Sequence, residues 1–212
     1  MITGRQLKRV SPKLTDARAL ELANIISQKC NEYKVNKDML EELLANATHE
    51  SGDFTIKAEN MNYSTARRII DVWPSRFAEL ATPTRKRAFD FVRNPVGLAN
   101  EVYNGRMGNR QRSNDGFNFR GGGYAQITGR DAYQQYMNFK KANMELEAFA
   151  RLVQTTEEFA IDSLFWFFCE FKNLEQLSVD DKMMDIVKRW NGGFIGLEDR
   201  LRRYDLIKRV LS

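Results

Sequence analysis

The 212-residue sequence contains a single histidine, His49, and two cysteines, Cys30 and Cys169. Zinc sites are built mainly from these residue types in patterns such as HExxH or CxxC, and neither pattern occurs. The two cysteines lie far apart in the sequence, so we interpret both as free thiols. The shortage of metal ligands disfavours a zinc amidase or zinc peptidase, and we expect no metal and no other cofactor.

Long hydrophobic runs are also missing. The most apolar stretch, LFWFFC at 164–169, is far shorter than the roughly 20 residues needed to span a bilayer, so it predicts a core helix and no membrane insertion. Near the N-terminus, Arg5, Lys8 and Arg9 are not followed by the apolar segment of a secretory signal peptide. We therefore expect a protein that is synthesised in the cytosol without a signal peptide.

The composition is that of an ordinary soluble globular protein, with 42% apolar and 29% charged residues. Its length is enough for one domain spanning residues 1–212, with room for a small helical lobe around 64–105. The net charge of +5 favours approach to a polyanion such as nucleic acid, anionic lipid or an anionic cell wall. Charge alone does not choose among these partners.

Apolar residues recur with helical spacing along most of the chain, and Thr15 and Asn36 are suited to cap the first two helices. The fold class predicted is therefore all-α, or α with a minimal hairpin near 119–128. The segment from 104 to 123 holds six glycines and no helical period, and a loop of this length usually carries function. The helices are expected at about 16–33, 36–49, 64–72, 83–92, 95–105, 131–139, 145–153, 157–171, 179–190 and 197–210.

Two glutamates stand near the end of the second predicted helix. The segment THESGDF (48–54) places Glu50 at the helix end, and Glu59 begins ENMNY (59–63) nine positions later in a loop. Hydrolysis of a glycosidic bond with inversion needs one carboxylic acid and one carboxylate on opposite sides of the sugar. Spacing alone does not distinguish these two residues from ordinary solvated acids.

Two glycine-rich segments follow. In FRGGGYAQITGRDAY (119–133), the glycines allow close approach of the backbone to a ligand, and Gln126 and Thr128 alternate as in an extended strand. In RWNGGFIGLEDR (189–200), Asn191 and Arg200 are able to bind a sugar or a carboxylate. Each segment could equally be a structural turn. His49 and Trp190, adjacent to Glu50 and Asn191, could bind sugar or simply pack.

Five segments taken together resemble the family 19 glycoside hydrolases, in particular their lysozyme-like branch in phage endolysins and bacterial chitinase-like proteins. They are HES, ENMNYS, VYNGRMGN, FRGGGYAQITGRDAY and WNGGFIGLEDR, in the order and approximate spacing of that family over about residues 15–211. The resemblance implies a lysozyme-like, two-lobed helical fold with a central cleft. It also implies a single glycoside hydrolase catalytic domain over 1–212 with no separate wall-binding module.

The resemblance also implies roles for single residues. Glu50 matches the general acid, Glu59 the base of the phage branch, and Thr128 the residue that helps to hold the attacking water. Relatives commonly have Arg-Gly-Arg-Gly where this chain has Arg120 followed by three glycines. The second arginine is thus replaced by Gly122, and any sugar or phosphate contact that it makes in relatives is not expected here. The expected substrate-binding residues are Tyr63, Arg120, Gln126, Asn191 and Arg200.

The function implied is that of a monomeric endolysin that cuts the β-1,4 bond between N-acetylmuramic acid and N-acetylglucosamine in bacterial peptidoglycan. Such a protein accumulates in the host cytoplasm and reaches the periplasmic wall through a holin or similar membrane lesion. The alternatives are a chitinase acting on poly-N-acetylglucosamine, and an inactive protein that binds sugar or nucleic acid. Basic residues are scattered over several helices rather than gathered in a stripe, so no nucleic-acid partner is expected.

Overall fold

A computed structural model describes residues 2–179 and 182–212, and the all-α fold class is confirmed. The described chain divides into two compact units. Unit 1 comprises residues up to Ala58, Gly122–Ile127 and Arg151–Ser212, and unit 2 comprises Glu59–Gly121 and Thr128–Ala150. The two segments 122–127 and 128–150 show that each unit draws on parts of the chain that are distant in sequence.

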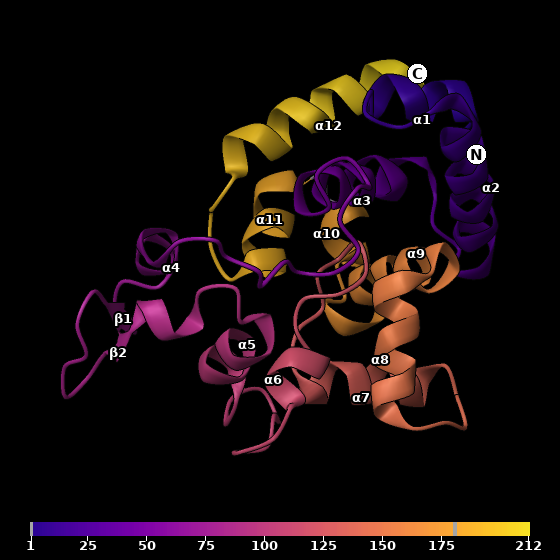
Figure 1. The fold of residues 1–212 in the computed structure, drawn as a ribbon. Helices are drawn as coiled ribbons and strands as arrows, with labels where there is room; N and C mark the ends of the chain where they lie inside the picture. The colour runs from indigo at the N-terminus through magenta and orange to yellow at the C-terminus, as the bar shows by residue number, and fades with distance from the viewer. Residues whose placement is uncertain (1, 180–181) are drawn as a thin grey trace. The chain divides into compact units, whose positions relative to one another are not determined.

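Unit 1 is built around α3, which packs against α9, α10, α11 and α12 (Figure 1). The short helix α1 packs against α2 and α12, and Gln6 Nε2 donates to the Val210 carbonyl oxygen at 3.1 Å. Apolar residues on one face of each helix form the core. The elements are α1 (Gly4–Val10), α2 (Asp16–Glu32), α3 (Lys37–Glu50), α9 (Glu157–Trp166), the π-helical turn η2 (Phe167–Phe171), α10 (Glu175–Val179), α11 (Met183–Asn191) and α12 (Leu197–Leu211).

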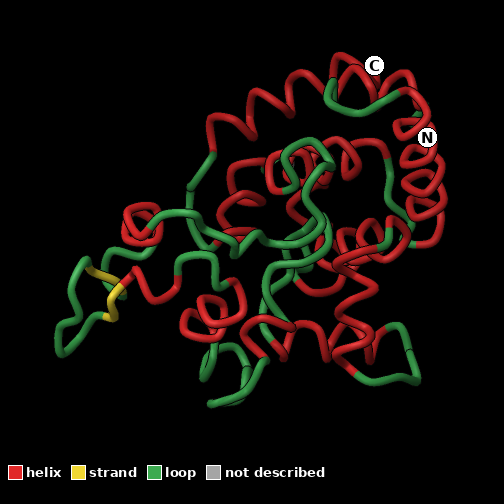
Figure 2. The backbone as a smooth tube through the Cα atoms, in the orientation of Figure 1, coloured by secondary structure: helices red, strands yellow, loops and turns green. Residues whose placement is uncertain are grey.

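Unit 2 has its own core cluster, in which Met61, Ile69, Phe77 and Leu98 are almost fully buried. Its two short strands pair in parallel and appear yellow in Figure 2. The elements are α4 (Ala66–Val72), β1 (Phe77–Ala78), β2 (Lys86–Arg87), the 3-10 helix η1 (Ala88–Phe91), α5 (Pro95–Tyr103), α6 (Asp115–Asn118) and α7 (Arg130–Phe139). Helix α8 (Leu146–Thr155) begins among residues of unit 2 and ends among residues of unit 1.

The long periodic helices agree with their predicted positions to within about two residues, because side-chain hydrogen bonds cap them where the sequence indicated. Thr15 and Asn36 cap α2 and α3, for example. The helix expected at 179–190 corresponds to α10 and α11, with residues 180 and 181 outside the described part of the chain.

Three local predictions were wrong or incomplete. The segment 83–92 is not an α-helix but contains β2 and η1, since Lys86 pairs with Phe77 rather than with its own neighbours. Helix α1 was missed because its burial depends on packing against α2 and α12. The strand expected at Gln126 and Thr128 is a turn, because Gln126 has φ +54°, and the hairpin is reduced to isolated bridges from Gly122 to Ala58 and Ile127.

Among the described residues, no helix combines the length and apolar character required to cross a membrane.

Candidate active site

Glu50 is the last residue of α3, and the backbone turns sharply after it. Ser51 holds this turn: its Oγ donates to the Ala47 carbonyl oxygen at 2.6 Å and accepts from the Phe54 backbone N–H at 2.8 Å. Gly52, Asp53 and Phe54 all have positive φ values between 56° and 68°. The carboxylate of Glu50 therefore lies at the end of a rigid helix, and the backbone that follows Glu50 turns away from this end.

The side chain of Glu50 is bound by Arg200 from α12. Arg200 is only 2% exposed, and its Nη2 donates to Glu50 Oε1. The same guanidinium donates from Nη1 to Asn46 Oδ1 at 2.7 Å and from Nη2 to Asn191 Oδ1 at 3.2 Å. A buried arginine thus ties Glu50 to α3, α11 and α12 at once.

Asn191 and Arg200 were expected to bind substrate, and the structure brings both to Glu50 through protein contacts. Asn191 ends α11, and its Nδ2 donates to the Ile195 carbonyl oxygen at 2.9 Å. This bond closes the Gly192–Gly196 turn that leads into α12. Their expected role in substrate binding stays a prediction. In unit 1, Arg200 contacts the candidate acid directly, and Asn191 contacts Arg200.

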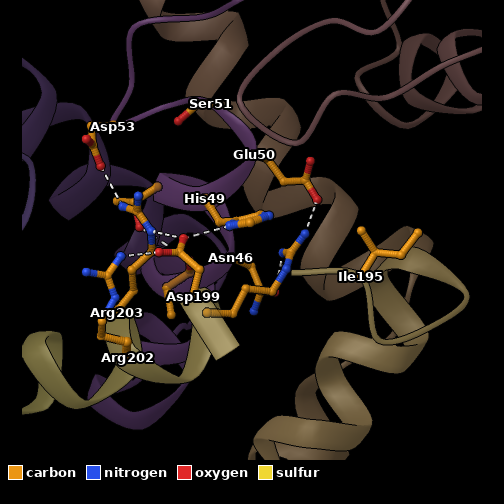
Figure 3. Close-up of polar contacts among 12 residues, drawn as sticks. Asn46, His49, Glu50, Ser51, Asp53, Ile195, Asp199, Arg202 and Arg203 are labelled. Carbon is orange, nitrogen blue, oxygen red and sulfur yellow. Dashed lines mark hydrogen bonds and ion pairs between the residues drawn. The ribbon is translucent and has the colours of Figure 1, made fainter. Parts of the chain in front are cut away.

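A charged cluster lies beside Glu50 on the same helix end (Figure 3). His49 Nδ1 lies 2.8 Å from Asp199 Oδ2, and Arg203 donates to Asp199 at 2.6 Å and to Asp53 at 2.6 Å. Burial on its own would raise the pKa of Asp199, but hydrogen bonds from His49, Arg203 and Arg202 outweigh burial and hold that pKa below its ordinary value. The cluster fastens the first turn of α12, which carries Arg200, to the end of α3.

Glu59 belongs to unit 2, where donors from two segments hold its side chain. The Tyr103 hydroxyl at the end of α5 lies 2.8 Å from Oε1 and 3.0 Å from Oε2, and the Gly121 backbone N–H donates to Oε2 at 3.3 Å. The Glu59 backbone N–H donates to the Gly121 carbonyl oxygen at 2.8 Å. Burial raises the pKa of Tyr103, and the negative charge of Glu59 raises it further, so the hydroxyl stays a donor near neutral pH.

Tyr63 and Arg120 lie close to Glu59 in unit 2. Tyr63 packs edge-on against Trp73, with ring centroids 5.5 Å apart, and burial followed by the charge of Glu59 raises its pKa. Arg120 Nε donates to the Glu59 carbonyl oxygen at 3.1 Å, and its guanidinium stacks over the Phe117 ring at 4.2 Å. Arg120 supports the loop that carries Glu59, and binding of substrate by either residue stays a prediction.

The remaining two candidates lie in different units. Gln126 belongs to unit 1, where its Nε2 donates to the Gly123 carbonyl oxygen at 2.9 Å. Thr128 belongs to unit 2 and directly precedes Gly129, whose N–H donates to the Phe119 carbonyl oxygen at 2.8 Å. The structure therefore does not support the prediction that Gln126 and Thr128 alternate along one extended strand.

Two residues that support the candidate carboxylates were missed in the sequence: Asn46 binds Arg200, the partner of Glu50, and Tyr103 binds Glu59 directly. Asn46 lies one helical turn before Glu50 and is fully buried, and an amide within the otherwise apolar run LLANA was a signal for an internal polar partner. Tyr103 lies in the VYNGRMGN segment, but nothing in the local pattern pairs it with Glu59. Within the described chain, no group of three or more histidine, cysteine or acidic residues is arranged to hold a metal ion.

Comparison with known proteins identifies the family. No family model matches the chain. A Haemophilus influenzae protein named "Glycosyl hydrolase family 19 domain-containing protein" is 31% identical over 171 residues, which cover 80% of this chain and 78% of the relative. Identity at this level over most of both chains is sufficient to establish common membership. The chain therefore belongs to glycosyl hydrolase family 19 and is a glycoside hydrolase.

Proposed function

We propose that this glycoside hydrolase cleaves the β-1,4 bond between N-acetylmuramic acid and N-acetylglucosamine in bacterial peptidoglycan, with Glu50 as general acid and Glu59 as general base. The observation that carries the proposal is the fixed position of Glu50, which the buried Arg200 and the capped end of α3 hold together. A catalytic carboxyl group must be held in place by its neighbours in order to meet the leaving oxygen of a bound glycan.

The contacts of Glu50 leave one of its oxygens available. Arg200 donates to Oε1, and no hydrogen bond to Oε2 occurs within the described part of unit 1. Oε2 is therefore the oxygen assigned to carry the proton that is passed to the leaving oxygen of the glycosidic bond. Arg200 fixes the direction in which this proton is presented, because its own position is set by Asn46 and Asn191.

Glu59 is suited to the role of the base by the donors around it. Tyr103 and the Gly121 N–H both donate to its side chain, which is the pattern expected for a carboxylate that acts as an acceptor. In this role it takes a proton from water, and Thr128 is proposed to hold that water as family resemblance implies. Attack of this water while Glu50 protonates the leaving oxygen gives inversion.

The biological role proposed is that of an endolysin. The net charge of +5 assists approach to the wall, because the peptide stems of peptidoglycan carry carboxylates. The protein would act as a monomer in the periplasm after a membrane lesion releases it. Expression in a Gram-negative host should therefore cause lysis when the inner membrane is permeabilised, and lysis without permeabilisation would contradict this route.

The substitution Glu50→Gln tests the catalytic assignment. We expect it to lower the rate on purified peptidoglycan by about 10²- to 10⁴-fold, the range for loss of a general acid. Gln keeps an oxygen for Arg200, so the protein should remain folded with unfolding free energy reduced by about 1–2 kcal/mol. Glu21→Gln, an exposed position on α2, is the matched control and should leave both quantities unchanged.

The products decide between substrates. Mass spectrometry of digested peptidoglycan should find N-acetylmuramic acid at the new reducing ends, and chitin should be hydrolysed more slowly. Normal activity of Glu50→Gln would refute the acid assignment. Cleavage of chitin with intact peptidoglycan would instead establish the chitinase alternative.

A further inference from the structure

A polar hollow lies in unit 2 beside the loop that joins β1 to β2. Its volume is about 470 Å³, and it is lined by the chain from 81 to 86 together with Ser75, Arg76 and Glu101. We call it the Arg85 pocket. Neither Glu59 nor any other candidate catalytic residue lines it, so it is a site of its own within unit 2.

The loop around the Arg85 pocket is held in shape. At its base, Phe77 and Ala88 are fully buried in the core cluster, and the Lys86 N–H donates to the Arg76 carbonyl oxygen at 2.8 Å. At its tip, the Thr82 N–H donates to the Arg85 carbonyl oxygen at 2.9 Å, and Thr82 Oγ1 accepts from the Arg85 N–H at 3.0 Å. The backbone that carries the lining side chains is therefore held in place by contacts within unit 2.

The charges of the lining do not cancel. Arg76 is engaged with Glu101, since its Nη1 donates to the Glu101 carbonyl oxygen at 2.7 Å and lies 3.9 Å from its carboxylate. The side chains of Arg85 and Lys86 make neither hydrogen bonds nor ion pairs with other residues of the described chain, and both are exposed. Three lining cations against one lining anion leave two positive charges uncompensated.

The remaining lining groups narrow the ligand class. No aromatic ring lines the pocket, so it lacks the stacking surface that a neutral sugar would favour. Ser75 and Thr84 add hydroxyl donors beside the two cations. Hydroxyl, ammonium and guanidinium donors together suit a carboxylate, which accepts charge-assisted hydrogen bonds from all three.

We propose that the Arg85 pocket binds the carboxylates of the peptide stems of peptidoglycan. This inference rests on the proposed function, because chitin has no peptide stems and offers no such group. The pocket would hold the stems while the glycan is cleaved elsewhere on the protein. The pocket would thereby raise kcat/KM for peptidoglycan relative to that for uncharged glycans.

The test compares two doubly substituted proteins of equal net charge. Arg85→Gln with Lys86→Gln removes the two free cations of the pocket, and Arg112→Gln with Lys141→Gln removes two exposed cations of unit 2 that do not line it. For each protein, kcat/KM is measured at low ionic strength on soluble peptidoglycan strands with their peptide stems and on strands stripped of stems by an amidase.

We expect the pocket variant to lose about threefold to tenfold in kcat/KM on strands with stems, the range for removing two exposed charge contacts. On stripped strands it should equal the wild type, and the control variant should equal the wild type on both substrates within a factor of about two. Equal losses for the pocket and control variants, or an equal loss on stripped strands, would overturn the inference while leaving the proposed function intact. A wild-type protein unable to cleave either kind of strand would overturn both.

Discussion

Replacement of Asn46 by alanine tests whether the buried arginine beside Glu50 is held as the structure indicates. Asn46 is fully buried, and its Oδ1 accepts from Arg200 Nη1 at 2.7 Å. Its Nδ2 donates to the Glu42 carbonyl oxygen at 2.9 Å, a bond internal to α3. The substitution leaves α3 with a good helix former but takes away the partner of a buried charged group.

The expected cost follows from the other contacts of Arg200. Its Nε is already buried without a hydrogen bond in the described structure, so the loss of Asn46 leaves a second nitrogen unsatisfied. An unsatisfied buried donor costs about 1–3 kcal/mol, and a charged one lies toward the upper end. We expect a loss of about 2–3 kcal/mol in the free energy of unfolding and a fall of about 5–10 °C in Tm.

Activity should fall with stability, because Arg200 is no longer fixed in front of Glu50. Misplacement of a catalytic group by about 1 Å lowers rates by up to about 10²-fold, so we expect kcat to fall by about 10- to 100-fold with a smaller change in KM. Urea unfolding and initial rates on peptidoglycan measure the two effects. Asn31→Ala, at an exposed position of α2, is the control and should change stability by less than about 0.5 kcal/mol.

The reasoning would be refuted by an Asn46→Ala protein that matches the wild type in stability and kcat. Loss of stability with unchanged kcat would show that Arg200 stays in place without Asn46. That outcome would reduce Asn46 to a structural residue.

Two further predictions concern other contacts of the site. Tyr103→Phe removes the hydroxyl that donates to both carboxylate oxygens of Glu59, so kcat should fall about threefold to tenfold with retained folding, and an unchanged kcat would contradict the pairing. Hydrogen bonds lower the pKa of Asp199 despite its burial, so its ionised form stabilises the folded protein by about 1 kcal/mol, a value suited to a partly exposed group. This stabilisation is present above the unfolded pKa near 3.9 and is lost as the pH falls from about 5 toward the lowered pKa. Asp199→Asn should therefore weaken the acid dependence measured by unfolding between pH 3 and 7, and an identical profile would contradict it.

The sequence predicted the helices well where one face was apolar over several turns. Helix α3 shows the limit of this signal: its periodicity and its cap fixed the helix and placed Glu50 at its end. The partner of Glu50, however, is 150 positions away on α12. Periodicity predicts which face of a helix is buried, but it does not predict which residue packs against that face.

The short elements were predicted wrongly because they too depend on tertiary contacts that the local sequence does not reveal. The segment 83–92 has helical spacing, but Lys86 pairs with Phe77 and Ala88 is buried in the core of unit 2. Tertiary contacts outweigh weak local preferences in elements of two to four residues. The candidate residues that the sequence did supply came from the order of whole segments, whereas the residues that support them, Asn46 and Tyr103, required coordinates.

The sequence left two interpretations open for the glycine-rich segments, a ligand-binding loop or a structural turn, and the structure gives a structural reason for two of their glycines. Gly123 has φ +67°, and a side chain there would meet Ser163 Oγ at 2.1 Å. At Gly196, with φ +72°, a side chain would meet His49 Nε2 at 2.4 Å. Glycine is favoured at both positions because φ is positive and a neighbouring side chain lies close to the backbone. Close approach at Gly196 is nevertheless what sets the start of α12 against His49, and so brings Arg200 to Glu50. The turn at 192–196 thus helps to position the arginine that contacts the candidate acid.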